Sequence, residues 1–258
     1  MKSNEIKNDA LEPSNGRDRR KFLKLSGMAL VGGGLLLSCS DDDDNMMEPD
    51  PTDPDAAFDL GSGNVGILNY AYALEQLEAA FYIEVLKGSY YAGASAEEKA
   101  ILEDVTNHEI IHRDFFKAAI TAAVPAEQVL PDLEFDFTAG AGVDFSSRDS
   151  VLATAVLLED TGVSAYNGAG KLIDVSSDTG AVYLGLAGKI VSVEARHASA
   201  FRDLVSPNTS NFASDDVLVG IGTDPAFDKA VLPADVLAAV IDLKFVVTPF
   251  TANNLPTA

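Results

Sequence analysis

Apolar residues recur three or four positions apart over four long stretches of the chain, which is the spacing of one face of a helix. The first stretch is followed by Lys87 and Gly88, a cation and then a glycine, as is common where a helix ends. The second begins at Ser95. The pattern predicts four helices, over residues 66–86, 95 to about 125, 147–173 and 179–205.

The links between these helices predict how they are connected. Short loops join the first helix to the second and the third to the fourth, whereas residues 124–146 form a long link. Extended at about 3.3 Å per residue, this link is long enough to cover the full length of a bundle. The predicted fold is therefore all-α, a four-helix bundle over residues 61–206 with a long crossover between its second and third helices.

A C-terminal tail, residues 207–258, follows the bundle and contains one further predicted helix over residues 233–245. Pro233 would occupy its first position, where proline is favoured. We expect the apolar residues of this helix to dock onto the bundle. They are Val236, Leu237, Val240, Ile241 and Phe245.

Acidic residues lie on the apolar faces of the first and third predicted helices. Glu75 precedes Tyr82 by seven residues, and Glu159 precedes Tyr166 by the same number. Because seven residues are nearly two helical turns, each Tyr lies on the same stripe as its Glu. The two helices therefore repeat one arrangement.

The second and fourth helices each carry a Glu-x-x-His motif, at Glu109–His112 and at Glu194–His197. The Glu of the first helix precedes its motif by 34 residues, and the Glu of the third helix precedes its own by 35. This repeated order indicates an internal duplication.

The repeated side chains are expected at one height of the bundle. Glu75 lies 13 residues before Gly88 and Glu109 lies 14 after Ser95, so both are about 20 Å from the turn between their helices. The second pair of helices behaves alike. Burying four carboxylates together would cost many kcal/mol without compensation. Two divalent cations would balance their four charges.

Three stretches carry a resemblance to a known family, namely residues 68–82, the run His-Glu-Ile-Ile-His at 108–112, and residues 158–166. With these motifs the sequence resembles the ferritin-like superfamily, particularly the ferritin-like proteins that include the desiccation-related proteins, over about residues 60–205. In such bundles a Glu from each of two helices and a Glu-x-x-His motif from each of the other two hold a pair of iron or manganese ions.

The resemblance implies roles for particular residues of this chain. The metal ligands would be Glu75, Glu109, His112, Glu159, Glu194 and His197. Tyr82 and Tyr166 would lie beside these ligands and are the candidate catalytic residues, because they could hydrogen-bond a ligand or donate an electron.

The N-terminal residues 1–38 resemble an export signal. An uncharged stretch over residues 25–37 follows the pair Arg19-Arg20, and it is too short to span a bilayer as a stable helix. The run Leu36-Leu37-Ser38-Cys39 resembles a bacterial lipobox with a bulky Leu37, and Cys39 would become the lipidated first residue. The Arg pair resembles a twin-arginine signal. An ordinary secretion signal with an incidental Arg pair is the alternative.

Charge and composition narrow the partners. The 258 residues carry 18 Lys+Arg and 40 Asp+Glu, a net charge of −22. Residues 1–38 hold seven basic and four acidic residues. Without them the chain has 11 Lys+Arg and 36 Asp+Glu, and its net charge is −25. This acidity argues against a nucleic-acid partner. Residues 39–60, with four consecutive Asp from Asp41 to Asp44, are predicted to form an acidic tether.

These features together predict a lipid-anchored metalloprotein of the bacterial cell envelope, held in the outer membrane through Cys39 and facing the periplasm or the cell surface. An active centre would make it an oxidoreductase of the ferroxidase or peroxidase type, whose two Fe (or Mn) ions pass electrons to O2 or peroxide. The single cysteine excludes a Cys-rich electron-donor domain, so electrons would come from Fe(II) itself or from a separate partner. The docked tail and the tether argue against a ferritin storage cage, while small homo-oligomers remain open.

Two other functions stay open on the sequence. One is a non-catalytic envelope protein, protective in drying or oxidative stress, whose metal site is structural or vestigial. The other is a zinc metalloprotease, because His108 and His112 flank Glu109 in the spacing that such enzymes use. Against the protease, the second copy has Val193 in place of His108, so the repeated feature is Glu-x-x-His alone.

Three further acidic residues are not among the six expected ligands. Glu78, three residues after Glu75, is either a spare ligand or a carboxylate at the solvent edge of its helix. Asp114 and Asp160 lie off the core stripe and are expected to be surface charges.

Overall fold

The computed structural model describes residues 57–257, except for 141, 214–216 and 222–223. The export signal, Cys39 and most of the tether lie outside the described residues. Among the described helices, none has both the length and the apolar character that crossing a membrane requires.

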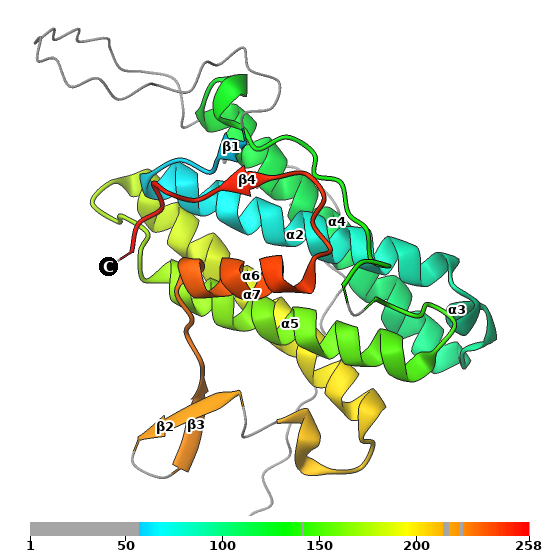
Figure 1. The fold of residues 1–258 in the computed structure, drawn as a ribbon. Coiled ribbons are helices and arrows are strands. Elements are labelled where there is room, and N and C mark those ends of the chain that lie inside the picture. Colours follow the sequence, from blue (N-terminus) through cyan, green and yellow to red (C-terminus); the bar gives the residue numbers. More distant parts are fainter. Residues whose placement is uncertain (1–56, 141, 214–216, 222–223, 258) are drawn as a thin grey trace, which may run out of the picture. The chain divides into compact units, whose positions relative to one another are not determined.

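Four long helices form a bundle of two pairs (Figure 1). Helix α2 (Gly63–Lys87) packs along α4 (Ala96–Ala123), and α5 (Arg148–Gly170) packs along α6 (Asp178–Val205). The pairs meet through contacts of α2 with α5 and of α4 with α6. The all-α bundle with a long crossover, predicted from the apolar pattern, is confirmed.

Three of these helices begin at a serine whose side chain caps the helix. Ser95 accepts a hydrogen bond from the backbone N–H of Glu98, while the Glu98 side chain accepts one from the N–H of Ser95. Ser147 and Ser177 cap α5 and α6 in the same position. Because a serine oxygen satisfies an N–H that the helix leaves free, these residues fix where the helices start.

The helix ends follow the sequence less closely. Helix α2 ends at Lys87, one residue after the predicted end, and the N–H of Gly88 donates to the carbonyl of Val85 at 3.0 Å. Helix α5 ends at Gly170 rather than at residue 173. The short elements that the apolar pattern did not predict are α3 (Ser89–Gly93), the 3-10 turns Ala126–Gln128 and Ser210–Phe212, and four short strands.

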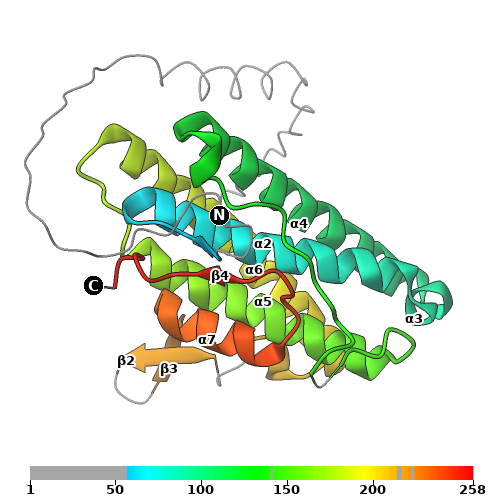
Figure 2. The same cartoon turned by 45° about the horizontal axis from the view of Figure 1, so that its top comes forward.

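The crossover between α4 and α5 runs along α2 (Figure 2) and is fastened to it by two buried amides. The side chain of Asn69 donates to the carbonyl of Gln128 at 2.9 Å and accepts from the N–H of Leu130 at 3.0 Å. Gln76 accepts from the N–H of Leu133 at 2.7 Å. These side chains satisfy backbone groups that an irregular link would otherwise bury unpaired.

Helix α7 (Pro233–Leu243) docks against α5. Val236, Leu237 and Val240 are buried as expected, but Ile241 is 58% exposed, so its predicted place in the docked face is wrong. The backbone turns at Lys244, with φ of 61°, and brings Phe245 onto Phe137 with the ring centroids 5.3 Å apart. The turn therefore fills the core with Phe245 and leaves Ile241 outside.

The tail also contains a hairpin. Strands β2 (Leu218–Ile221) and β3 (Asp224–Asp228) pair antiparallel, with an irregularity between Val219 and Gly220. Strands β2 and β3 are four and five residues long and carry no helix-period pattern, so the apolar pattern did not predict them.

The two ends of the described chain meet in a parallel pair of short strands. Strand β1 (Phe58–Asp59) lies beside β4 (Phe250–Thr251), and Leu60, which is fully buried, donates its N–H to the carbonyl of Thr251. Residues 58–60 were predicted to belong to the tether, and this boundary is wrong because they form part of the fold.

Candidate metal centre

The acidic residues of α2 and α5 are hydrogen-bonded by tyrosines of the opposite helix. The hydroxyl of Tyr82 donates to Glu159 Oε1 at 2.5 Å, and the hydroxyl of Tyr166 donates to Glu75 Oε1. All four side chains are buried. Each Tyr lies on the same stripe as the Glu of its own helix, but it bonds the Glu of the opposite helix. This happens because antiparallel helices bring the Tyr of one to the height of the Glu of the other.

The Glu-x-x-His motifs of α4 and α6 also contact each other reciprocally. Nδ1 of His112 lies 3.1 Å from Glu194 Oε1, and Nδ1 of His197 lies 2.8 Å from Glu109 Oε1. Each motif thus presents its His to the Glu of the other motif. The structure brings together all six side chains that the sequence nominated as ligands.

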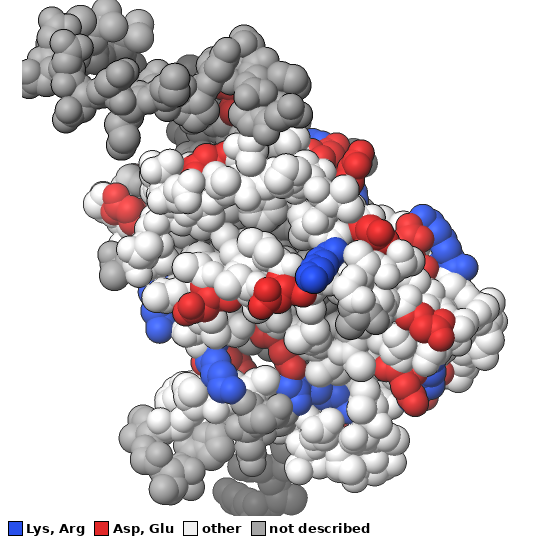
Figure 3. All heavy atoms as spheres, in the orientation of Figure 1, with Lys and Arg blue, Asp and Glu red and all other residues white. Residues whose placement is uncertain are grey.

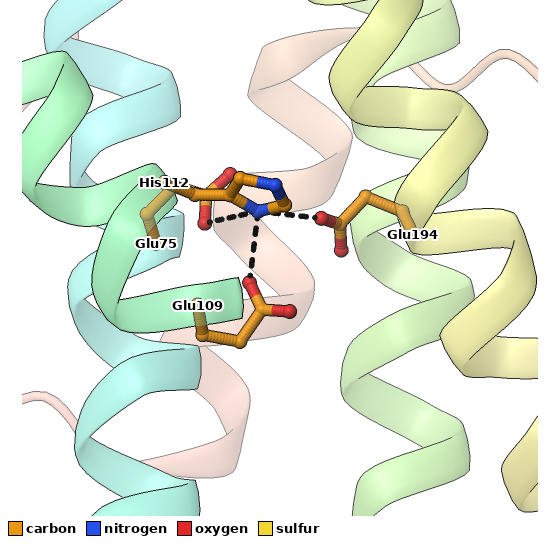
Figure 4. Close-up of side chains that lie close together, drawn as sticks. All are labelled: Glu75, Glu109, His112 and Glu194. Atoms are coloured by element: carbon orange, nitrogen blue, oxygen red, sulfur yellow. Dashed lines mark hydrogen bonds and ion pairs between the residues drawn. The ribbon is translucent and has the colours of Figure 1, made fainter. Parts of the chain in front are cut away.

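Two groups of ligand atoms result, and Glu109 and Glu194 belong to both. The first group adds Glu75 and His112, and the second adds Glu159 and His197, with the ligand atoms of each group within 4.8 Å of one another. Figure 4 shows the first group, in which Glu75, Glu109 and Glu194 surround Nδ1 of His112. Two residues shared between two groups are what a pair of bridged metal ions requires.

The buried carboxylate oxygens of this cluster have few partners. Glu78 Oε2 and Glu194 Oε2 have none. The others face only an imidazole Nδ1, that of His112 for Glu75 Oε2 and Glu194 Oε1, and that of His197 for Glu109 Oε1 and Glu159 Oε2. A buried carboxylate oxygen or imidazole nitrogen left unpaired costs about 1–3 kcal/mol or more. Cations coordinated by these atoms would remove that cost, so the donor set fits metal ions.

Burial and crowding set the protonation of the carboxylates. Burial raises the pKa of Glu159 to about 8. It also raises the pKa of Glu75 and of Glu194, and the neighbouring carboxylates add to the effect. Burial acts in the same direction on Glu109, but hydrogen bonding from His112 and His197 outweighs it and holds the Glu109 pKa at about 2.

The two histidines are shifted in the opposite sense to most buried histidines. Burial disfavours a charged imidazole, yet the facing carboxylates raise the pKa of His112 to about 12 and that of His197 to about 10. Protons on these rings, and on part of the Glu cluster, therefore supply the positive charge that the carboxylates need. A metal ion that binds here must displace these protons.

His108 joins the site from its exposed edge. Its Nδ1 lies 2.9 Å from Nε2 of His197, and the two rings stack with centroids 5.1 Å apart. If Nδ1 of His197 held a metal ion, its Nε2 would carry the hydrogen and could donate it to His108, which would fix the tautomer of the ligand. His108 belongs to neither ligand group, so the geometry of a zinc metalloprotease is not formed. All three histidines of the chain meet here.

The structure places two further acidic residues, Glu78 and Asp160, largely away from the solvent. Glu78 is 3% exposed and lies inside the cluster, which excludes the solvent-edge alternative. Asp160 is paired with the buried guanidinium of Arg202, so its predicted place as a surface charge is wrong. Arg202 lies three residues before the end of α6 and faces Asp160, and the apolar pattern did not predict this pair. Asp114 is exposed as expected.

Two surface pockets lie away from the cluster. One, of about 700 Å³, is enclosed by α2, α4 and the crossover, and another, of about 310 Å³, lies between α5, α6 and the tail. None of the six ligand candidates lines either pocket. The carboxylates of the cluster are themselves fully buried.

The fold and the site together define a four-helix bundle with a buried carboxylate–histidine cluster at its centre. The family model described as a ferritin-like domain matches residues 63–207. The chain therefore belongs to the ferritin-like family. No curated protein matches it.

Proposed function

We propose that this chain is a di-metal carboxylate protein that holds two iron or two manganese ions in its bundle. Glu75 and His112 would serve one ion, Glu159 and His197 the other, and Glu109 and Glu194 both. The observation that carries the proposal is the convergence of six buried ligand side chains into two groups that share Glu109 and Glu194.

The choice of metal follows from the donor atoms. The cluster offers carboxylate oxygens and imidazole nitrogens only, and the single Cys of the chain is at position 39. Carboxylates suit manganese and non-haem iron, whereas thiolates would favour zinc or copper(I). Four carboxylates balance two divalent ions in charge.

A bound pair of redox-active ions would supply electrons to O2 or peroxide. The side chains of this chain do the positioning. Tyr82 and Tyr166 orient Glu159 and Glu75 through their hydroxyl hydrogen bonds, and each is buried against a Phe, Phe201 at 5.6 Å and Phe116 at 6.3 Å between ring centroids. These aromatic rings exclude water from the carboxylates.

The test is metal analysis of the purified chain after removal of metal and reconstitution. We expect about two Fe or Mn ions per chain, and their loss in a Glu109→Ala variant, because Glu109 is shared by both groups. Consumption of Fe(II) and peroxide is measured on the same samples. Absence of bound metal after reconstitution would overturn the proposal.

A second candidate function is a non-catalytic protein in which the metals hold the bundle together. The observation in its favour is the complete burial of the carboxylates, away from both pockets. Two bound metals that stabilise the chain without consuming Fe(II) or peroxide would identify this function.

The location follows as part of the same proposal. The lipobox-like run ending at Cys39 supports anchoring in the bacterial envelope, and a twin-arginine route would let the chain fold and load metal before export. On the face drawn in Figure 3, Lys and Arg side chains stand among Asp and Glu, and the expectation of no nucleic-acid partner rests on the net charge of −22. Fatty-acid labelling that persists in a Cys39→Ala variant would contradict the anchor.

A further inference from the structure

Glu78 is a fifth carboxylate at the centre of the bundle. It lies on α2 one turn after Glu75, is only 3% exposed, and its Oε2 has no hydrogen-bond partner. The charged groups that act on it most strongly are other carboxylates, led by Glu194 and Glu109. Its Oε2 is therefore a buried ligand-type atom that no other side chain satisfies.

A glycine on the facing helix makes room for this side chain. A Cβ atom at Gly162 of α5 would stand 3.0 Å from Glu78 Oε1 and 3.2 Å from Glu194 Oε2. Both carboxylates therefore reach the same point on α5. Glu78 is thus directed at the carboxylate that belongs to both ligand groups, and not at the solvent.

The internal duplication also indicates that Glu78 and Gly162 belong together. Glu75 and Tyr82 of α2 correspond to Glu159 and Tyr166 of α5, with equal spacing. Three residues after the Glu, α2 has Glu78 whereas α5 has Gly162. One copy of the repeat thus supplies an extra carboxylate, and the other copy supplies the space for it.

We propose that Glu78 is a seventh ligand of the metal centre, bound beside Glu194 in the space that Gly162 leaves. This inference rests on the proposed di-metal function. The two metal positions would then be chemically different, because only one copy of the repeat supplies this fifth carboxylate. A larger set of oxygen ligands favours six-coordinate manganese or iron over zinc, which prefers four ligands.

The test is titration of the metal-free full-length chain with Mn²⁺, and separately with Co²⁺, whose visible absorption weakens as its coordination number rises. The variant is Glu78→Gln, which keeps the shape and removes the charge. The control is Glu84→Gln, an exposed carboxylate on the same helix. We expect the unchanged chain and the control to bind two ions. Glu78→Gln should bind one of the two at least about 10-fold more weakly, as losses around metal ligands do, with stronger Co²⁺ absorption.

The outcomes separate this inference from the function on which it rests. Two ions bound by the unchanged chain, with the same affinities and Co²⁺ spectrum in Glu78→Gln, overturn the role of Glu78 alone. Failure of the unchanged chain to bind two ions overturns the di-metal function itself. If Glu78→Gln does not fold, Glu78→Asp takes its place, because it keeps the charge but withdraws the carboxylate by one methylene and should weaken the same ion. Unchanged binding in Glu78→Asp then contradicts the inference.

Discussion

At the scale of single residues, the site is built from reciprocal contacts rather than from local pairs. Tyr82 serves Glu159 while Tyr166 serves Glu75, although each Tyr shares a helix with the other Glu. One break in this reciprocity is His108, which supports His197 through a 2.9 Å contact and has Val193 as its counterpart in the second copy. The two halves therefore have equivalent ligands but different surroundings.

Replacement of His108 tests this support. We expect His108→Ala to weaken the binding of one of the two ions about 10-fold, because loss of a hydrogen-bond partner behind a ligating His costs 10–100-fold in affinity. Ile111→Ala, on the exposed side of the same helix, is the control and should change neither ion. Isothermal titration with Mn²⁺ measures both affinities. Equal weakening of the two ions would contradict a role confined to His197.

At the scale of elements, close packing joins the tail to the bundle. A Cβ at Gly168 of α5 would stand 1.7 Å from the carbonyl oxygen of Val231, and the N–H of Val231 donates to the carbonyl of Ser164 at 3.0 Å. The segment that leads into α7 therefore lies directly on the backbone of α5. Gly185 of α6, by contrast, is exposed and would meet nothing within 4 Å.

These two glycines give a matched pair of variants. We expect Gly168→Ala to lower the free energy of unfolding by about 1–3 kcal/mol, as overpacking does, and to loosen the tail. Gly185→Ala should raise it by about 0.4–1 kcal/mol, because alanine restricts the unfolded chain at a helical position. Urea denaturation measures both, and proteolysis of the tail separates local from global loss. A Gly168→Ala variant as stable as the unchanged chain would contradict the packing.

Local signals predicted the elements that depend on local physics. The cap at Ser95, the glycine at 88 and the helical spacing of apolar residues placed all four long helices, and the repeated Glu and His placed the ligands at one height. Contacts between distant segments carried no such signal. Phe58 pairs with Phe250 through strands of two residues, and the packing of the helices determines that Tyr82 bonds Glu159. The sequence could not predict either partner.

At the scale of the whole molecule, the metal-free bundle holds a group of protonated side chains that an unfolded chain would not. His112, His197 and Glu159 have raised pKa values, so the folded chain binds their protons more tightly than the unfolded chain does. Their stabilisation is complete below the unfolded pKa and is lost as pH rises through the folded one. Glu109 behaves oppositely, and its contribution is lost as pH falls towards 2.

The stability of the metal-free chain should therefore fall as pH rises from about 5 to about 10. The window runs from the ordinary pKa of 4.5 to about 8 for Glu159, and from 6.5 to about 10 for His197. The metal-loaded chain should not lose stability over this range, because metal binds the deprotonated forms. Urea unfolding at a series of pH values compares the two. Glu159→Gln should flatten the fall between pH 5 and 8, and a metal-free chain that gains stability over that range would contradict the account.

The parallel pair β1–β4 determines which residues would first bear a force applied to the N-terminal side of the fold. Force applied ahead of residue 57 reaches Phe58 and Asp59 first, and these residues are bound to Phe250 and Thr251 of the tail. The carboxylate of Asp59 also accepts hydrogen bonds from the Thr251 hydroxyl at 2.9 Å and the Asn253 N–H at 3.2 Å. Tension on residues 58–59 would therefore be shared with residues 250–253 of the tail before it reaches α2, the helix that carries Glu75.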